Sequence, residues 1–158
     1  MVEDFKHRNS KMYQIQTLFK SKEFDKIADY VYDEDPIIKA EAINILGRSK
    51  DHKQKQLLVA CLEDDDQHIR YCAADALANF NSDDVLEALI IAAKENSDFV
   101  RCKAISSIGK IHSAKSINFL SSLLLSSNNI VAKEAALALE NLLDIKECQE
   151  VLKDLFEI

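Results

Sequence analysis

One pattern of residues returns every 31 positions, and this repeat constrains the fold of the chain more than any other feature. Its first column is a branched apolar residue: Ile38, Ile69, Val100 and Val131. Four positions later each repeat has an alanine: Ala42, Ala73, Ala104 and Ala135. Eight positions later comes a larger apolar residue: Leu46, Leu77, Ile108 and Leu139. Because offsets 0, 4 and 8 share one face of a helix, they predict the buried stripe of a first helix, which we call helix A.

A second apolar stripe in each repeat predicts a second helix, helix B. It begins twenty positions after the first column: Leu58, Leu89, Leu120 and Val151. It continues four positions further on: Leu62, Ala93, Leu124 and Leu155. Residues that cap helix N-termini precede both helices. The predicted caps of helix A are Asp35, Asp66, Ser97 and Asn128, and those of helix B are Asp51, Ser82, Ser113 and Asp144.

Projecting the repeat backwards predicts a degenerate first unit. This places Asp4 at the cap of helix A and puts Ile15, Phe24, Ile27 and Val31 at apolar positions. The chain is then a single all-α domain, residues 1–158, of five helix pairs: 4–34, 35–65, 66–96, 97–127 and 128–158. With only 2 Gly and 1 Pro among 158 residues, a fold of many tight turns is hard to build, whereas ten helices are compatible with this composition.

The repeat resembles a known type. The run from Asp98 to Gly109, and the parallel run from Ile69 to Leu77, are similar to the D-x-V-R-x-x-A-x-x-A-L-G signature of short HEAT-like repeats, the type also found in phycobilisome lyase subunits. The resemblance covers Asp35 to Ile158, although Ala132 and Glu140 depart from the signature in the last unit. It implies a right-handed α-solenoid with A helices on the convex side and B helices on the concave side.

Charge and hydropathy argue against several kinds of partner. The 20 Lys and Arg against 27 Asp and Glu give a net charge of −7, which opposes binding to nucleic acid or to anionic membranes. No apolar run approaches the roughly 18 residues of a membrane span, and residues 1–10 are too polar for a secretory signal, which predicts a cytoplasmic protein. The four cysteines form no CxxC pair and are interpreted as reduced thiols: Cys61, Cys72, Cys102 and Cys148.

No set of residues predicts catalysis, a metal or another cofactor. The HEAT-like deoxyhypusine hydroxylases hold iron with His-Glu dipeptides, but the residues after the four histidines here are Arg8, Lys53, Ile69 and Ser113. His68, Cys72 and Cys102 supply three ligands at most, and structural zinc sites take four. The acidic runs 33–35 and 63–66 lack the alternating ligands and glycine of a calcium loop, so we interpret them as helix caps.

These observations predict a non-catalytic adaptor or scaffold that binds another protein through the concave side of its B helices. Opposite the buried stripe of helix B lie offsets 15, 18, 22 and 25. In the first three units these positions carry a net −2, and in the last two a net +3. A partner helix or strand with apolar anchors flanked by acids would fit the C-terminal half. The predicted contact residues are Ile91, Lys94, Lys115, Asn118, Ser122, Leu125, Lys146, Gln149, Lys153 and Phe156.

Two alternatives remain open at this point. The resemblance to phycobilisome lyase subunits implies an accessory subunit of an enzyme of the phycobilin-lyase type, although no single residue points to a bilin. In the last unit Leu137 and Leu143 fill columns that are polar in earlier units. Because capping repeats usually become more polar outward, this predicts that the C-terminal repeat packs on a second copy or on a partner.

Overall fold

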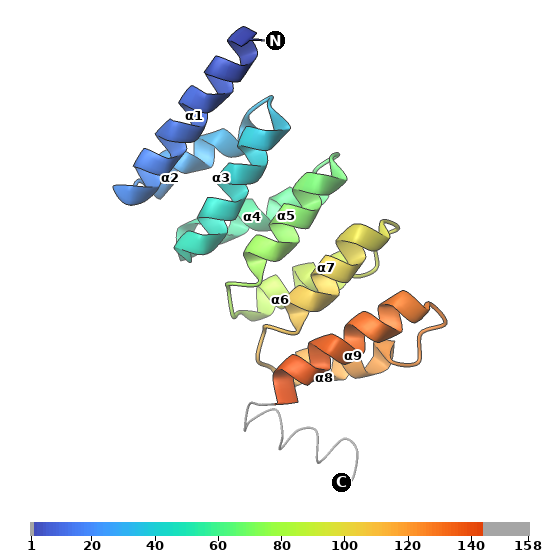
Figure 1. Cartoon of the computed structure of the whole chain (residues 1–158). Helices are drawn as coiled ribbons and strands as arrows, with labels where there is room; N and C mark the ends of the chain where they lie inside the picture. The colour runs from blue at the N-terminus through green and yellow to red at the C-terminus, as the bar shows by residue number, and fades with distance from the viewer. Residues whose placement is uncertain (1, 144–158) are drawn as a thin grey trace. The chain divides into compact units, whose positions relative to one another are not determined.

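A computed structural model of the chain describes residues 2–143, with side chains for residues 5–142. These residues form nine α-helices and three short 3-10 turns (Figure 1). The tenth predicted helix falls on residues 144–158 and lies outside the described part. The chain divides into two compact units, Met1–Asn79 and Phe80–Ile158, and each is considered by itself.

The first unit contains α1, α3 and α5 as A helices, which pack side by side (Figure 1). They span Val2–Lys20, Pro36–Ser49 and Gln67–Leu77. The two B segments are short helices joined to 3-10 turns. The first consists of α2 and η1 (Phe24–Ala28 and Asp29–Tyr32), and the second of η2, α4 and η3 (His52–Gln54, Lys55–Ala60 and Cys61–Glu63).

The second unit alternates B and A helices in the same way. The B helices are α6 and α8, spanning Asp83–Ala92 and Ala114–Leu123. The A helices are α7 and α9, spanning Asp98–Ile108 and Asn129–Leu143. Helix α7 packs against both α6 and α9, and α9 also packs against α8. The all-α fold of paired helices predicted from the sequence is therefore confirmed in the described residues.

Most of the predicted caps are confirmed. The side chains of Asp35, Asp66 and Ser97 accept from the first backbone N–H groups of α3, α5 and α7, and six predicted caps accept in this way in all: Asp35, Asp66, Ser97, Asn128, Asp51 and Ser113. Ser82 is the N-cap residue of α6, as predicted, but its side chain makes no cap bond and its hydroxyl is buried without a partner. One predicted cap was wrong. Asp4 lies inside α1, which begins at Val2, so it cannot be an N-cap. Asp144 lies outside the described residues.

The predicted stripes form the core. The first two columns of helix A are buried in every repeat from Ile38 to Ala135, and in the degenerate first repeat the buried residues are Ile15, Ile27 and Val31. The last column of helix B is less uniform. Leu124 was predicted to be buried and is 38% exposed, and Leu62 in the same column is half-buried, whereas Ala93 is buried.

Neighbouring A helices approach each other closely at two glycines. A Cβ added to Gly47 in α3 would lie 2.5 Å from the Cβ and 2.7 Å from the Cα of Ala76 in α5. In the second unit, a Cβ on Gly109 would lie 2.8 Å from the Cα of Ala138 in α9. Real Cβ atoms do not come this close to other carbons, so a side chain at either position would force the two helices apart.

Candidate binding surfaces

The side of the B helices opposite the core, which we call the B face, is exposed wherever it is described. It comprises offsets 15, 18, 22 and 25 of each repeat. In the first unit these are Lys22, Asp25, Asp29, Tyr32, Lys53, Gln56, Ala60 and Glu63, and in the second they are Asp84, Glu87, Ile91, Lys94, Lys115, Asn118, Ser122 and Leu125. All sixteen side chains are exposed, so none of them is needed to fill the core.

Two large apolar residues stand out on the B face of the second unit. Ile91 on α6 is 73% exposed, and Leu125, just after α8, is 94% exposed. Lys94 lies one turn from Ile91, and Asn118 and Ser122 lie on the exposed side of α8. The remaining predicted contact residues lie outside the described part of the chain: Lys146, Gln149, Lys153 and Phe156.

Lys115 is not a free cation of the B face. Its ammonium lies 2.6 Å from a carboxylate oxygen of Glu87, and both side chains are largely exposed. The pair links α8 to α6. The sequence interpretation assigned Glu87 to the acidic part of the surface and Lys115 to the basic part. Since the two charges neutralise each other, the predicted contrast between the two parts is weaker than the residue count implied.

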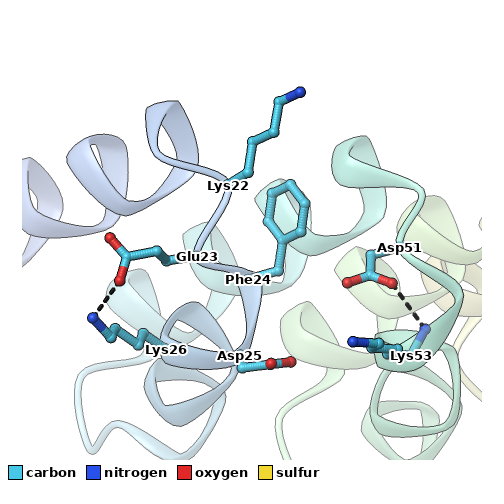
Figure 2. A pocket seen from close by; sticks show the side chains of 7 residues that line it. All are labelled: Lys22, Glu23, Phe24, Asp25, Lys26, Asp51 and Lys53. Carbon is cyan, nitrogen blue, oxygen red and sulfur yellow. Dashed lines mark hydrogen bonds and ion pairs between the residues drawn. The ribbon is translucent and has the colours of Figure 1, made fainter.

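The B face of the first unit contains a pocket of about 260 Å³ (Figure 2). Its lining comes from two successive turns between an A and a B helix: Lys22, Glu23, Phe24, Asp25, Lys26, Asp51 and Lys53. The two turns are joined by a 2.6 Å hydrogen bond from the Gln54 amide to Asp25. In Figure 2 the Phe24 ring lies between the turn that carries Lys22 and the turn that carries Lys53. The Phe19 ring packs against it with centroids 6.2 Å apart.

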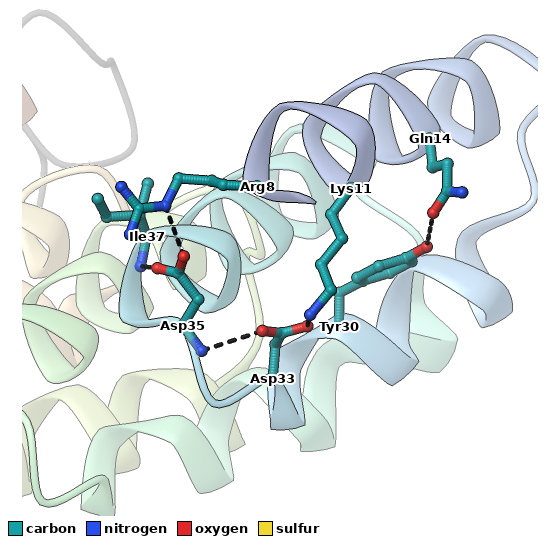
Figure 3. A network of polar contacts seen from close by, with 7 residues as sticks. All are labelled: Arg8, Lys11, Gln14, Tyr30, Asp33, Asp35 and Ile37. Atoms are coloured by element: carbon teal, nitrogen blue, oxygen red, sulfur yellow. Dashed lines mark hydrogen bonds and ion pairs between the residues drawn. The ribbon is translucent and has the colours of Figure 1, made fainter. Parts of the chain in front are cut away.

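The acidic runs of the first unit serve the starts of the A helices. Arg8 and Lys11 on α1 reach Asp35 and Asp33 at 2.5 and 2.6 Å (Figure 3), and Lys39 on α3 reaches Asp64 at 3.0 Å. Each of these aspartates also accepts from a backbone N–H of its own turn.

These contacts shift three carboxyl pKa values. Burial raises the pKa of Asp33, Asp35 and Asp64, but hydrogen bonds from the neighbouring cations and from the backbone outweigh it and hold each pKa below its ordinary value. The runs therefore supply helix caps, as interpreted from the sequence. Their ion pairs, which the sequence analysis did not predict, also link successive repeats, and we call the whole set the capping network.

The thiols and histidines do not assemble a reactive site in the described part of the chain. The Cys72 sulfur lies 3.8 Å from Nε2 of His68, but no group of three or more His, Cys, Asp or Glu is placed to hold a metal ion among residues 2–143. Burial raises the pKa of Cys61 to about 11 and also raises that of Cys102, which disfavours the reactive thiolate. Over the same residues, no helix is both long and apolar enough to cross a membrane.

Comparison with known proteins identifies the family. The sequence matches the HEAT repeat family over residues 24–105 and 63–140, which together cover 117 of the 158 residues. The chain belongs to the HEAT repeat family. Comparison with curated proteins finds no match to this HEAT-repeat chain.

Solved structures similar to this HEAT-repeat protein include two from enzyme systems. Human deoxyhypusine hydroxylase aligns with a TM-score of 0.68 and 15% identity over 77% of this chain, but this chain spans only 44% of the aligned hydroxylase chain. The CpcE–CpcF complex of phycocyanin lyase from a Nostoc species aligns with a TM-score of 0.61 and 21% identity, over 93% of this chain and 91% of the other. A designed armadillo repeat protein aligns with a TM-score of 0.54 and 18% identity, over 89% and 74%. At these identities the likeness shows the fold alone.

The sequence analysis missed the pocket around Phe24. It assigned Phe24 to the buried stripe of the first B helix, but the side chain is only half-buried, and it lines the pocket. Lys22 has a left-handed backbone, with φ of 58°, at a helix end where glycine is the usual residue. The pattern of apolar positions does not register a lysine in that column, so the left-handed turn beside the pocket becomes visible only in the structure.

Proposed function

We propose that this HEAT-repeat protein is a non-catalytic adaptor that binds another protein through the B face of its second unit. The observation that carries this proposal is the exposure of Ile91 and Leu125 on a face where the other described positions are polar or charged, apart from Tyr32 and Ala60 in the first unit. Large apolar side chains anchor protein interfaces when polar residues surround them.

The repeat register explains how the two anchors can act together. The position equivalent to Ile91 in the next repeat is Ser122, and the position equivalent to Leu125 in the preceding repeat is Lys94. In the repeat register the two apolar residues therefore take diagonal positions of adjacent repeats, with Lys94 and Ser122 at the other two positions, and the Lys115–Glu87 pair links the same two repeats. This arrangement suits a helix or extended segment that presents two apolar side chains beside an acidic one. Lys146, Gln149, Lys153 and Phe156 extend the proposed surface toward the C-terminus.

A comparative pull-down tests this proposal. Wild-type protein, an Ile91→Ser and Leu125→Ser double variant, and an Ile37→Ser control are used as baits in lysate of the native organism, and the captured proteins are quantified by mass spectrometry. Ile37 is 50% exposed but lies on an A helix, so the control alters an apolar surface residue away from the B face. We expect at least one protein that wild type and control retain and the double variant loses. Equal recovery on all three baits would contradict the proposal.

A second candidate is an accessory subunit of the phycobilin-lyase type. It is supported by the similarity to the CpcE–CpcF complex, which extends over nearly the whole of this chain and of the chain it aligns with. Mixing the protein with a bilin and an apo-phycobiliprotein tests this candidate, and a coloured covalent adduct would support it. For the hydroxylase, the sequence argues against a shared activity, since none of the four histidines precedes a glutamate. The five repeat boundaries, the cytoplasmic location and self-association through the last repeat remain predictions.

A further inference from the structure

One end of the first unit is strongly basic although the chain is acidic. The turns from A to B helices occupy residues 20–26 and 48–55, and they carry seven lysines and arginines against three acids, a net +4 in a chain of net −7. Because α1 and α3 run parallel, both turns lie at the same end of the unit (Figure 1). We call these two segments the basic edge. Its cations are Lys20, Lys22, Lys26, Arg48, Lys50, Lys53 and Lys55.

The acids of the basic edge are already engaged, whereas several of its lysines, including Lys22 and Lys53, are not. Glu23 pairs with Lys26, Asp25 accepts from Gln54, and the Asp51 side chain caps the backbone N–H of Lys53. Within residues 2–143, by contrast, the Lys22 and Lys53 ammonium groups have no ion-pair or hydrogen-bond partner. Both line the pocket around Phe24, so two available cations flank an aromatic ring.

The geometry points to the basic edge as a docking site for a short acidic segment of a protein partner, with one apolar side chain on Phe24 and carboxylates at Lys22 and Lys53. This inference rests on the proposed protein-binding function but uses a surface in the other unit. The opposite end of the first unit carries eight acids in residues 28–35 and 60–67, of which Asp33, Asp35 and Asp64 pair with cations of the A helices. The remaining acids would repel a long polyanion that reached them. A short segment bound at the basic edge would avoid this repulsion, which is screened beyond a Debye length of about 8 Å.

The test uses the full chain and a blocked peptide, acetyl-Glu-Glu-Leu-Glu-Glu-amide, in an NMR titration of backbone amides. We expect shifts confined to residues 20–26 and 48–55, with an affinity that falls as salt is added. A Lys22→Gln and Lys53→Gln double variant should bind about tenfold more weakly, since both contacts are lost. Its matched control is Lys6→Gln with Lys133→Gln, which has the same net charge and alters exposed lysines elsewhere. This control should retain the wild-type affinity within about twofold.

Lys22→Gly separates binding from folding. Glycine suits the left-handed backbone at this helix end, so the variant should be at least as stable as wild type while binding the peptide about threefold more weakly. Lys50→Gly relieves a similar backbone, with φ of 55°, and removes a charge of the basic edge that does not line the pocket, so it should weaken binding less.

Three results would overturn the inference. The first is the absence of any localised shift at about 10 mM peptide. The second is tighter binding of an oligothymidylate of similar charge, which would indicate a phosphate ligand, and the third is the same amide shifts on concentrating the protein alone, which would make a second copy the occupant. The Ile91 and Leu125 experiment is independent of all three, so either proposal can fail without the other.

Discussion

Gly47 and Gly109 fix how closely neighbouring A helices pack, because at each of them a helix backbone rests directly on the next helix. The obstruction comes from the backbone of the facing helix as well as from its side chain. A Cβ added at Gly47 would lie nearly as close to the Cα of Ala76 as to its Cβ. Trimming the facing alanine would therefore leave most of the obstruction in place. Such close approach explains why a small residue occurs at both positions. Gly47 lies inside α3, where glycine is otherwise unfavourable, and Gly109 is the C-cap residue of α7.

We predict that Gly47→Ala destabilises the protein by about 1 to 3 kcal/mol, because the added methyl forces α3 and α5 apart. In an uncrowded helix the same change would stabilise by up to about 1 kcal/mol. Urea unfolding monitored by circular dichroism measures the difference. Adding Ala76→Gly should restore little of the loss, and full restoration would show that only the two side chains were in conflict.

Substituting two buried serines by alanine should change the stability of the protein in opposite directions. Ser107 is fully buried, and its hydroxyl has no hydrogen-bond partner, so Ser107→Ala should stabilise the protein by about 1 kcal/mol. Ser116 is equally buried, but its hydroxyl lies 3.0 Å from that of Ser113, so Ser116→Ala should cost about 1 kcal/mol. Thermal unfolding of both variants in the same buffer measures the two effects. A loss of stability in Ser107→Ala would reveal a partner for its hydroxyl that the geometry does not show.

At the scale of elements, periodicity predicted the helix starts and buried columns that recur in every repeat. It missed features that occur in one repeat only. The start of each A helix from Asp35 to Asn128 follows from an apolar column and a capping residue, both visible in the sequence. Ser82 and Leu124 departed from the pattern because a column records only the type of residue. It does not report how deeply a particular side chain packs or which way a hydroxyl points. The Lys115–Glu87 pair was missed because an ion pair between repeats depends on side-chain reach.

The capping network should make the first unit sensitive to acid. Asp33, Asp35 and Asp64 have folded pKa values below the ordinary value of about 3.9 expected in the unfolded chain. Their contribution to stability is therefore fully present above that value and is lost as the pH falls through the folded pKa values. We expect the free energy of unfolding to decrease between about pH 5 and pH 2, as measured by urea unfolding at each pH.

Lys11→Met provides the control for this interpretation. It removes the cation that lowers the pKa of Asp33, so that pKa should rise in a carbon-detected NMR titration of the carboxyl groups. The acid-induced loss of stability should also become smaller. An unchanged Asp33 pKa in the variant would show that the backbone N–H of Asp35 is sufficient to hold it down.

At the scale of the whole chain, stability is distributed over two compact units, each with its own core. Leu77 is fully buried in the first and Leu120 in the second, and both were predicted from the repeat. In repeat proteins stability is approximately a sum of local terms and nearest-neighbour terms. A destabilising substitution in one core should consequently lower stability most in the unit that contains it.

Leu77→Asp and Leu120→Asp test this distribution directly. Each change leaves a cavity and buries an unpaired carboxylate, so each should cost more than about 3 kcal/mol. Hydrogen exchange resolves where the cost falls. In Leu120→Asp the amides of α7, α8 and α9 should lose protection while those of α3 and α5 keep most of theirs, and Leu77→Asp should give the reverse. Uniform loss of protection in both variants would mean that the chain unfolds as one cooperative block, and wild-type protection in either would mean that its leucine is not a core residue.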